Sequence, residues 1–524
     1  MALIPYMMLT SPGFTPDPSP RDIPYNAWTN LTGVRVRDNG IHSYQKDYVT
    51  SPDPGIAPYA ITYVDDAAGG PLYLYAGATA AYALQNGSHT DVTRTAGAYT
   101  GSKWNFNHFN GVLLANNGVD VPQVWSPPSP ATKMVDLPNW PANTLAKVMR
   151  SYLNFIIALN VTKSGVVHDN MVKWSHYADP GSVPSSWDPT DTTKDAGEYA
   201  LASGLDPVVD CRLMGNVNVI YKRDSIWLMR YTGGLQVFRF DPAVESLGAL
   251  SVNCIASLPN GSHIVLGRGD MYVFNGQGVQ SVVDGRTRKW LFSRIDGTNM
   301  ESVFLAHDIL RSEIMVCIPV PEQVYADVAL VWNYVSNSFY LRDLPNISGV
   351  TYGEILIGSG ETFDGSSGTF NSDGGPFDSL PLNPTDRHLI FASPANQKIY
   401  IGDTDQGAET TPGDVLLERV SLPTDSDREG NLRVDFTTRQ MVTEVWPKVD
   451  SVNCEEIRVY IGSQEASNDP IAWDGPHIFN PLVDEYVSVW ANGKIFSVRF
   501  EADAGQEFTF LGFSLQVQPL GVSS

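Results

Sequence analysis

The stretch Ile264–Gly276, IVLGRGDMYVFNG, contains a pattern that recurs through the chain. A short apolar run is followed by the polar turn Gly267–Asp270, a second run at Met271–Phe274, and the turn residues Asn275 and Gly276. Short runs rich in Val, Ile, Tyr and Phe between Gly, Asn and Asp are typical of antiparallel strands joined by tight turns. The stretch therefore predicts a β-hairpin followed by a further turn.

Similar paired runs lie on both sides of this hairpin. They are 72–76 with 81–84, 112–115 with 121–125, 219–221 with 226–231, 329–332 with 339–341, and 389–392 with 398–402. With one more run near residue 159, the hairpins stand about 40–66 residues apart, and a four-stranded propeller blade takes about 40–50 residues. We therefore predict an all-β fold, a β-propeller of about six blades. Two or three unrelated β-sandwiches are the alternative, with less regular spacing.

Composition divides the chain into five parts. They are an N-terminal docking arm at 1–24, a propeller core at 25–357, a Gly-, Ser- and Asp-rich loop at 358–385, closing propeller strands at 386–404, and a smaller C-terminal β-sandwich or platform at 405–524. The arm is too apolar for a free tail, so we expect it to dock onto a neighbouring subunit or onto the platform. Helical periodicity is nearly absent, and the best helix candidate is 195–202.

Charge and length limit the possible functions. The chain has 524 residues, with 57 acidic and 34 basic side chains and a net charge of −23. An acidic protein of this kind does not grip nucleic acid by its phosphates, because that requires a basic surface. No apolar run approaches the roughly 20 residues that span a bilayer, so we expect no membrane insertion. The start of the chain lacks the basic region of a signal peptide.

The cysteines and glycines show no cofactor or metal motif. The four cysteines lack CxxC and zinc-ligand spacings, and we expect them to be buried apolar side chains; they are Cys211, Cys254, Cys317 and Cys454. Gly267-Arg268-Gly269 has Tyr272 where a dinucleotide-binding motif needs its third glycine, and no helix follows. A hairpin turn is the better interpretation.

The histidines and carboxylates are equally unspecific. The adjacent pairs His168-Asp169 and His307-Asp308 would point to opposite faces of a strand. The segment 425–430 copies the first half of a calcium loop, but Phe436 stands where a bidentate Glu is needed. The acidic residues within 403–414 form another polar loop. We therefore expect no enzyme activity, and we assign no catalytic, cofactor-binding or metal-binding residue.

A series of short motifs, taken in order, resembles the nozzle proteins of short-tailed bacteriophages, the tail-tubular-B-type family that includes the tail DNA-stabilisation proteins. The motifs span about 20–345 and are Ile23–Trp28 (IPYNAW), Asn30–Arg37 (NLTGVRVR), Asp38–Gly40, Trp104–Phe106, Val112–Asn116, Asp120–Trp125 (DVPQVW), Val172–Ser175, Asp179-Pro180, Trp187, Asp224–Trp227 with Tyr231, Gly233 and Phe238, and Val265–Gly276. Their shared order, more than any one motif, carries the resemblance.

The resemblance implies a β-propeller subunit that is a structural protein of the virion tail and has no catalytic residue or cofactor. Six copies would form a hexameric ring below the portal and the head-to-tail adaptor. This tail tube would retain the packaged genome and pass double-stranded DNA, without specific binding, during ejection into the host. Tail fibres or tailspikes, and a tail needle or plug, would be further partners. Assembly would take place in the host bacterial cytoplasm.

The charge of the chain agrees with a DNA conduit without requiring one. Each phosphate neutralised by Lys or Arg adds affinity, so acidic walls would keep DNA mobile; solubility alone also explains the acidity. Two other functions stay open. A phage-borne propeller glycosidase or lyase needs two carboxylates about 5–9.5 Å apart at the central mouth. A carbohydrate (receptor)-binding module would use exposed Trp473 or Trp490. A conduit must form a ring, whereas an enzyme need not.

Overall fold

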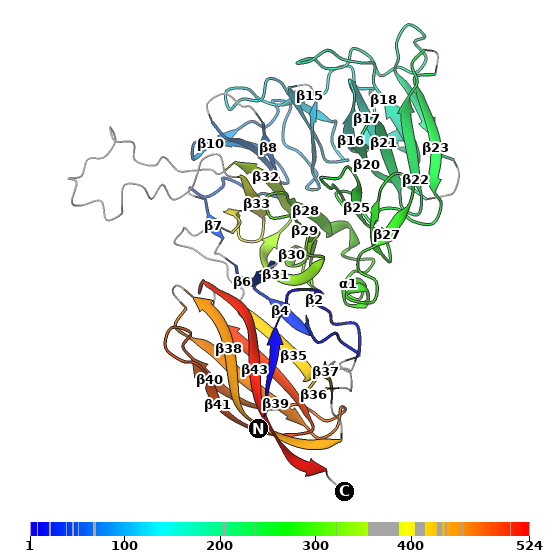
Figure 1. The fold of residues 1–524 in the computed structure, drawn as a ribbon. Coiled ribbons are helices and arrows are strands. Elements are labelled where there is room, and N and C mark those ends of the chain that lie inside the picture. Colours follow the sequence, from blue (N-terminus) through cyan, green and yellow to red (C-terminus); the bar gives the residue numbers. More distant parts are fainter. Residues whose placement is uncertain are drawn as a thin grey trace, which may run out of the picture.

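The structure is a computed structural model. It describes residues 2–522 apart from 8, 20–21, 38, 45–46, 51, 66–69, 110, 203–205, 235, 321, 355–386, 404–413, 427–431, 435–436, 452–453 and 504. The expected loop at 358–385 thus lies outside the described residues, which form β-strands joined by turns and loops, with very little helix (Figure 1). The described part contains no helix with the length and apolar character to cross a membrane.

Seven groups of four antiparallel strands follow one another in the upper part of Figure 1. Six of them are separate sheets, and the sixth group is part of a larger sheet. The first four are β8 (Ala60–Val64), β9 (Leu72–Ala76), β10 (Ala81–Gln85) and β11 (Ser88–Asp91); β12 (Asn105–Phe109), β13 (Val112–Asn116), β14 (Gln123–Trp125) and β15 (Val135–Asp136); β16 (Thr144–Tyr152), β17 (Phe155–Lys163), β18 (Val166–Trp174) and β19 (Gly197–Ala200); β20 (Val208–Met214), β21 (Val217–Lys222), β22 (Ile226–Tyr231) and β23 (Phe238–Val244).

The other three groups are β24 (Ile255–Ser257), β25 (His263–Leu266), β26 (Met271–Phe274) and β27 (Val279–Ser281); β28 (Phe304–Asp308), β29 (Glu313–Ile318), β30 (Ala326–Asn333) and β31 (Ser338–Ile347); β32 (Gly349–Glu354), β33 (Arg387–Ser393), β34 (Lys398–Ile401) and β7 (Tyr48–Val49). The first strand of each sheet contacts the first strand of the next, and β32 contacts β8. These contacts close a circle, so the all-β prediction and the β-propeller are confirmed.

The propeller has seven blades, whereas the sequence predicts about six. In the last blade, the fourth strand precedes the first blade in the chain. In that blade Tyr400 pairs with Val49 and Ile401 pairs with Tyr48. The backbone N–H of Thr50 extends this pairing by donating to the Ile399 carbonyl at 3.0 Å. The ring is therefore closed by backbone hydrogen bonds between segments about 350 residues apart.

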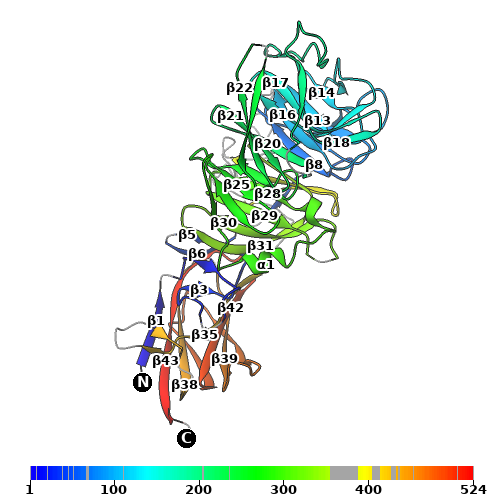
Figure 2. The ribbon, with the colours of Figure 1, turned by 90° about the vertical axis from the view of Figure 1, so that its right-hand side faces the viewer.

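The platform is a sandwich of two sheets below the propeller (Figure 2). One sheet contains β1 (Ala2–Met7), β5 (Val34–Arg37), β6 (Gly40–Ser43), β38 (Thr438–Ser451), β41 (Val487–Gly493) and β43 (Phe508–Val522). The other contains β4 (Asn30–Thr32), β35 (Val415–Leu422), β39 (Ile457–Gln464), β40 (Ala472–Phe479) and β42 (Ile495–Ala502). Smaller elements are β2 (Gly13–Phe14), β3 (Ala27–Trp28), β36 (Asp425–Ser426), β37 (Leu432–Arg433), α1 (Arg288–Phe292) and the 3-10 turn η1 (Met300–Ser302).

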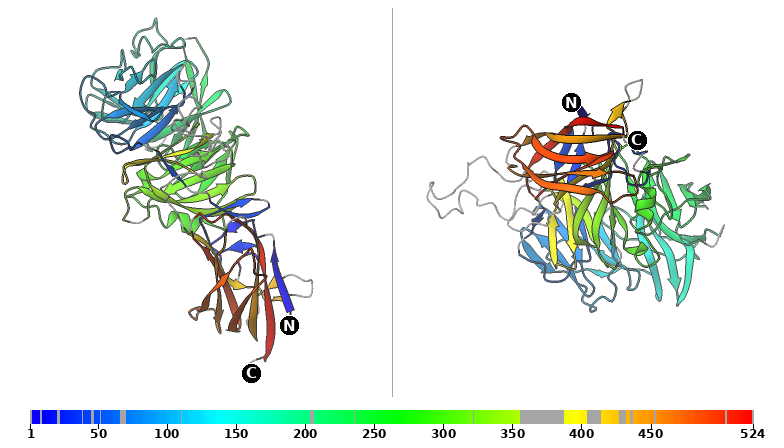
Figure 3. Two further views of the ribbon diagram at one scale, coloured as in Figure 1. Left: turned by 90° about the vertical axis from the view of Figure 1, so that its left-hand side faces the viewer. Right: turned by 90° about the horizontal axis from the view of Figure 1, so that it is seen from below.

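The boundary expected at residue 25 differs from the structure, because 27–43 belong to the platform. Trp28 and Leu31 are almost completely buried in the same core as Phe510 and Phe513. Residues 2–7 of the expected arm also lie on the platform of their own chain, where they form β1 and pair along β43. Both termini consequently lie at the far end of the platform (Figure 3). Sequence order does not reveal this return of the N-terminal segment to the C-terminal sheets.

The propeller and the platform share one sheet. Strand β31, the outer strand of the sixth blade, pairs in parallel with β4 through Leu341 and Thr32. Strand β4 in turn pairs with β35, so eleven strands form a continuous sheet from blade to sandwich. One hydrophobic core also extends from platform residues to the fifth and sixth blades. The two parts therefore form a single elongated body.

A buried ionic network, here called the junction network, joins three parts of the fold. Arg35 of β5 contacts Glu313 of β29 and Asp403, which follows β34, each at 2.5 Å. Arg311 also contacts Asp403, at 2.9 Å. Burial alone would raise the pKa of the Asp403 carboxyl, but Arg35 and Arg311 lower it to about 2. Asp403 therefore stays ionised, and its charge is balanced by two guanidinium groups.

The helix expected at 195–202 is wrong, because this segment forms the edge strand β19. Gly197 pairs with Trp174 of β18. A Cβ atom on Gly197 would lie 2.4 Å from the Trp174 ring, and the indole Nε1 donates to the Asp195 carbonyl at 2.8 Å. The Trp174 ring thus fixes an extended conformation through tertiary contacts that helical propensity does not include.

Candidate functional site

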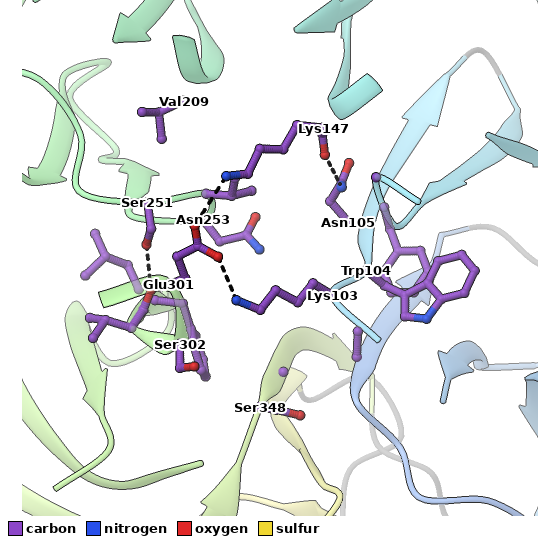
Figure 4. Close-up of a pocket in the computed structure, with 18 of the residues that line it drawn as sticks. Lys103, Trp104, Asn105, Lys147, Val209, Ser251, Asn253, Glu301, Ser302 and Ser348 are labelled. Carbon is purple, nitrogen blue, oxygen red and sulfur yellow. Dashed lines mark hydrogen bonds and ion pairs between the residues drawn. The ribbon is translucent and has the colours of Figure 1, made fainter. Parts of the chain in front are cut away.

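A cavity lies on the propeller axis. Its volume is about 1280 Å³, and residues of the first strand of every blade contribute to its wall (Figure 4). Because all seven inner strands begin at the same mouth, residues at equivalent positions gather there from distant parts of the sequence. The axial cavity is therefore the candidate functional site of this β-propeller.

A lysine–glutamate–lysine bridge crosses the cavity near this mouth. Lys103 immediately before β12 and Lys147 of β16 reach Glu301 of η1 at 2.8 Å and 3.5 Å (Figure 4). The hydrogen bond from Lys103 is the main reason why the pKa of the Glu301 carboxyl is lowered, and burial partly opposes this change. Glu301 is therefore ionised at neutral pH, and two cations share one carboxylate.

A second group of charges lies deeper along the same strands. Arg150 of β16 donates to the Asp210 carboxylate at 2.8 Å and to the Asn253 side chain at 3.0 Å. Burial lowers the pKa of the Arg212 guanidinium, and the like charge of Arg150 lowers it further. Asp210 opposes this shift, but its carboxylate is already bonded to Arg150. This layer therefore also has two cations for one carboxylate.

His307 of β28 supplies an imidazole to the cavity wall. Burial is the largest effect and lowers the pKa of this imidazole; Asp308 opposes it, and Arg212 lowers it further. The ring is therefore neutral at pH 7 and has one donor and one acceptor nitrogen. Its Nε2 lies 3.4 Å from the Tyr334 hydroxyl.

Amide side chains fix the relative positions of the second and third blades. The Asn105 amide nitrogen donates to the Asn116 carbonyl at 3.0 Å, and its oxygen accepts from the Met149 N–H at 3.2 Å. The Asn116 amide donates to the Ala146 carbonyl at 2.8 Å. These bonds hold β12 against β16, so Lys103, just before β12, and Lys147 of β16 have a defined separation.

The described lining does not form an acid–base pair of the kind that glycosidases use. Its only carboxylates in the described part of the chain are Asp169 and Glu301. A general acid needs a raised pKa, whereas the pKa of Glu301 is lowered. The Ser251 hydroxyl donates to the Val303 carbonyl at 3.0 Å and contacts the Cys254 thiol, so a histidine does not activate it.

Several sequence expectations can be placed in the structure. Gly267–Gly269 forms the β25–β26 turn, where the Gly267 N–H donates to the Asp270 carbonyl at 2.8 Å. The four cysteines are buried and free, as expected. Among the described residues, no cluster of His, Cys, Asp or Glu is suited to hold a metal ion. Most of the calcium-like segment, 427–430, lies outside the described residues.

Sequence reasoning missed two groups of residues. Asp403 is assigned to an unspecific acidic loop, but it lies buried in the junction network. Lys103, Arg212 and Glu301 belong to no motif of the sequence analysis, and they line one cavity only because the blades close a ring. The one available signal is position, since cavity residues lie in or next to the first strand of each blade.

The closed circle of sheets by itself defines the fold class, a β-propeller protein. The structure is similar to the WD40 β-propeller domain of Doa1, at 13% identity and a TM-score of 0.37, covering 68% of this chain and 96% of that one. It is also similar to a puromycin hydrolase, at 9% identity and a TM-score of 0.36, covering 62% of this chain and 54% of that one. No protein-family model and no curated protein matches the sequence.

Proposed function

We propose that this protein is the nozzle subunit of a short-tailed bacteriophage, a structural component of the virion tail without enzyme activity. Six copies would form a ring below the head-to-tail adaptor, retain the genome and pass DNA during ejection. The observation that carries the proposal is the eleven-stranded sheet shared by propeller and platform. A subunit that bears load in a tube needs such a stiff connection, whereas catalysis in an isolated propeller does not.

The positions of the motif residues support the proposal. Trp28 is almost fully buried in the platform, and its indole donates to the Leu9 carbonyl at 3.0 Å. Trp104 donates to the Gly77 carbonyl at 2.9 Å and thereby joins the first two blades. Arg35 anchors the junction network. The motifs that resemble the nozzle family thus include residues that hold the architecture together, as expected if the resemblance reflects a shared fold.

In the proposed ring, DNA passes between copies and not along the axis of a propeller. The bridge from Lys103 and Lys147 to Glu301 crosses the axial cavity. Cationic side chains there would also bind phosphates, which is the opposite of what a conduit needs. The acidic residues of the chain are therefore available for the walls between copies.

Exposed apolar residues at one edge of the platform provide a candidate ring contact. This platform-edge patch consists of Ile478, Leu482, Val483, Tyr486 and Trp490. Val483 and Trp490 are 78% and 72% exposed, and β41 lies at the edge of its sheet. A closed ring needs two different patches that meet head to tail, and large apolar side chains anchor such contacts.

Light scattering after size-exclusion chromatography, with negative-stain electron microscopy, tests the proposal on the full chain alone and with its adaptor. We expect closed rings of six copies. Val483→Asp should prevent ring formation without unfolding the subunit. Val335→Asp is the matched control, because Val335 is similarly exposed, at 69%, but lies in the β30–β31 turn of the propeller. Monomers under all conditions, with or without the adaptor, would contradict the nozzle proposal.

A carbohydrate-binding module is the second candidate, and exposed Trp490 favours it. Trp473 is less accessible for stacking, because the Arg499 guanidinium lies 4.5 Å from its ring centre. Binding of bacterial surface glycans on an array, lost in Trp490→Ala without any ring formation by the parent protein, would support this candidate over the nozzle.

A further inference from the structure

We propose that the axial cavity of the propeller binds a small oxyanion-bearing ligand, with Arg212 as its main anchor. The shared chemistry is a carboxylate or phosphate group of a molecule small enough to enter the cavity. This inference does not depend on the nozzle proposal, because it concerns the interior of one propeller and not the contacts between copies.

The charge of the lining is the first argument. The chain as a whole has a net charge of −23. The described lining of the axial cavity nevertheless has four cationic residues and only two carboxylates; these are Lys103, Lys147, Arg212 and Arg223, with Asp169 and Glu301. An acidic protein that collects cations around one cavity creates a local positive potential, which raises the concentration of anions there.

The second argument is that two half-buried arginines of the cavity wall lack acceptors for part of their side chains. The Nε atoms of Arg212 and Arg223 are inaccessible and have no hydrogen-bond partner. Neither residue forms an ion pair within the described part of the chain, and the nearby Asp210 is engaged by Arg150 at 2.8 Å. Both side chains line the cavity, so an oxyanion there would give their guanidinium groups an acceptor that the described part of the chain does not supply.

The third argument is the shape and chemistry of the remaining wall. At about 1280 Å³ the cavity is larger than an inorganic ion requires, and ligand pockets typically measure about 300–1,000 Å³. The lining also includes the neutral His307 imidazole and the amides of Asn117, Asn160 and Asn253. The planar guanidinium of Arg212 suits a carboxylate or phosphate, while the amides and imidazole suit neutral polar groups of the same molecule.

Isothermal titration at low ionic strength tests the inference with sodium citrate and inorganic phosphate, and with glucose as the neutral control. We expect one anion site per chain and no glucose binding. Arg212→Gln should lower the affinity for the anion at least about tenfold, since it removes charge-assisted hydrogen bonds. Arg212→Lys should lower this affinity less, because lysine keeps the positive charge but lacks the planar guanidinium group. Arg239→Gln, on the outer strand β23 of the same blade, is the exposed control and should bind normally.

Thermal unfolding gives an independent measurement on the same proteins. Citrate or phosphate should raise the unfolding temperature of the parent chain but not that of Arg212→Gln. Stronger binding of citrate than phosphate would identify an organic anion as the ligand class, and the reverse would identify a phosphate group. Failure of both anions to bind the parent chain, or unchanged binding in folded Arg212→Gln, would overturn the inference whether or not rings form.

Discussion

Replacing Arg35 with methionine should destabilise the protein strongly by leaving a charge buried at the junction of propeller and platform. Arg35 is the cation bonded to Glu313, whose side chain is fully buried. In the variant, Asp403 still has Arg311 at 2.9 Å, whereas Glu313 loses the cation that balances its charge. Removing one member of a buried ion pair costs about 3–5 kcal/mol. We expect Arg35→Met to lower the free energy of unfolding by an amount in this range.

The assay is urea unfolding, followed by the fluorescence of the 12 tryptophans and by far-ultraviolet circular dichroism. Arg35→Met/Glu313→Gln should recover part of the lost stability, because a neutral amide is less costly to bury than an unpaired carboxylate. Arg239→Met is the control; Arg239 is 64% exposed and pairs with Asp241, so the loss should stay below about 1 kcal/mol.

Two results would refute this reasoning. The first is a loss of less than about 1 kcal/mol in Arg35→Met, which would place the network among weak surface pairs. The second is a double variant no more stable than the single variant, which would show that lost packing, and not the unpaired Glu313 charge, causes the effect.

The remaining predictions concern Asp403 and Tyr6. The pKa of the Asp403 carboxyl is lowered to about 2 in the folded protein, against about 3.9 for an unfolded Asp. The contribution of Asp403 to stability is therefore complete above about pH 4 and is lost as the pH falls toward about 2. In Asp403→Asn, the urea midpoint should depend less on pH in this range. An unchanged pH dependence would contradict the lowered pKa of Asp403. Tyr6→Ala should lower the free energy of unfolding by about 3–5 kcal/mol and make β1 accessible to proteases. The reason is that the Tyr6 ring stacks on Phe513, with ring centres 4.7 Å apart, and its hydroxyl donates to the Pro423 carbonyl at 2.8 Å. Tyr6→Phe should cost about 1 kcal/mol, and equal losses in the two variants would refute the stacking contribution.

The hairpins are the part of the fold that sequence predicts well. The runs at 219–221 and 226–231 are local in sequence, and their alternation of apolar strands with turn residues is sufficient to pair them as β21 and β22. The turn at Gly267–Asp270 is similarly local. The helix expected at 195–202 fails for the opposite reason, since Trp174, more than twenty residues away, determines its conformation.

The sequence by itself determined that this protein is built from repeated antiparallel strands, because strand patterning and turn chemistry act over a few residues. Only the tertiary structure decided that there are seven blades, that β1 and β4 join the platform, and which side chains meet on the axis. Lys103 and Glu301 form an ion pair across 198 residues of chain, and Arg35 and Asp403 across 368. Such contacts depend on ring closure and the return of the N-terminal strands, because burial and charge pairing are properties of distance in space and not of spacing along the chain.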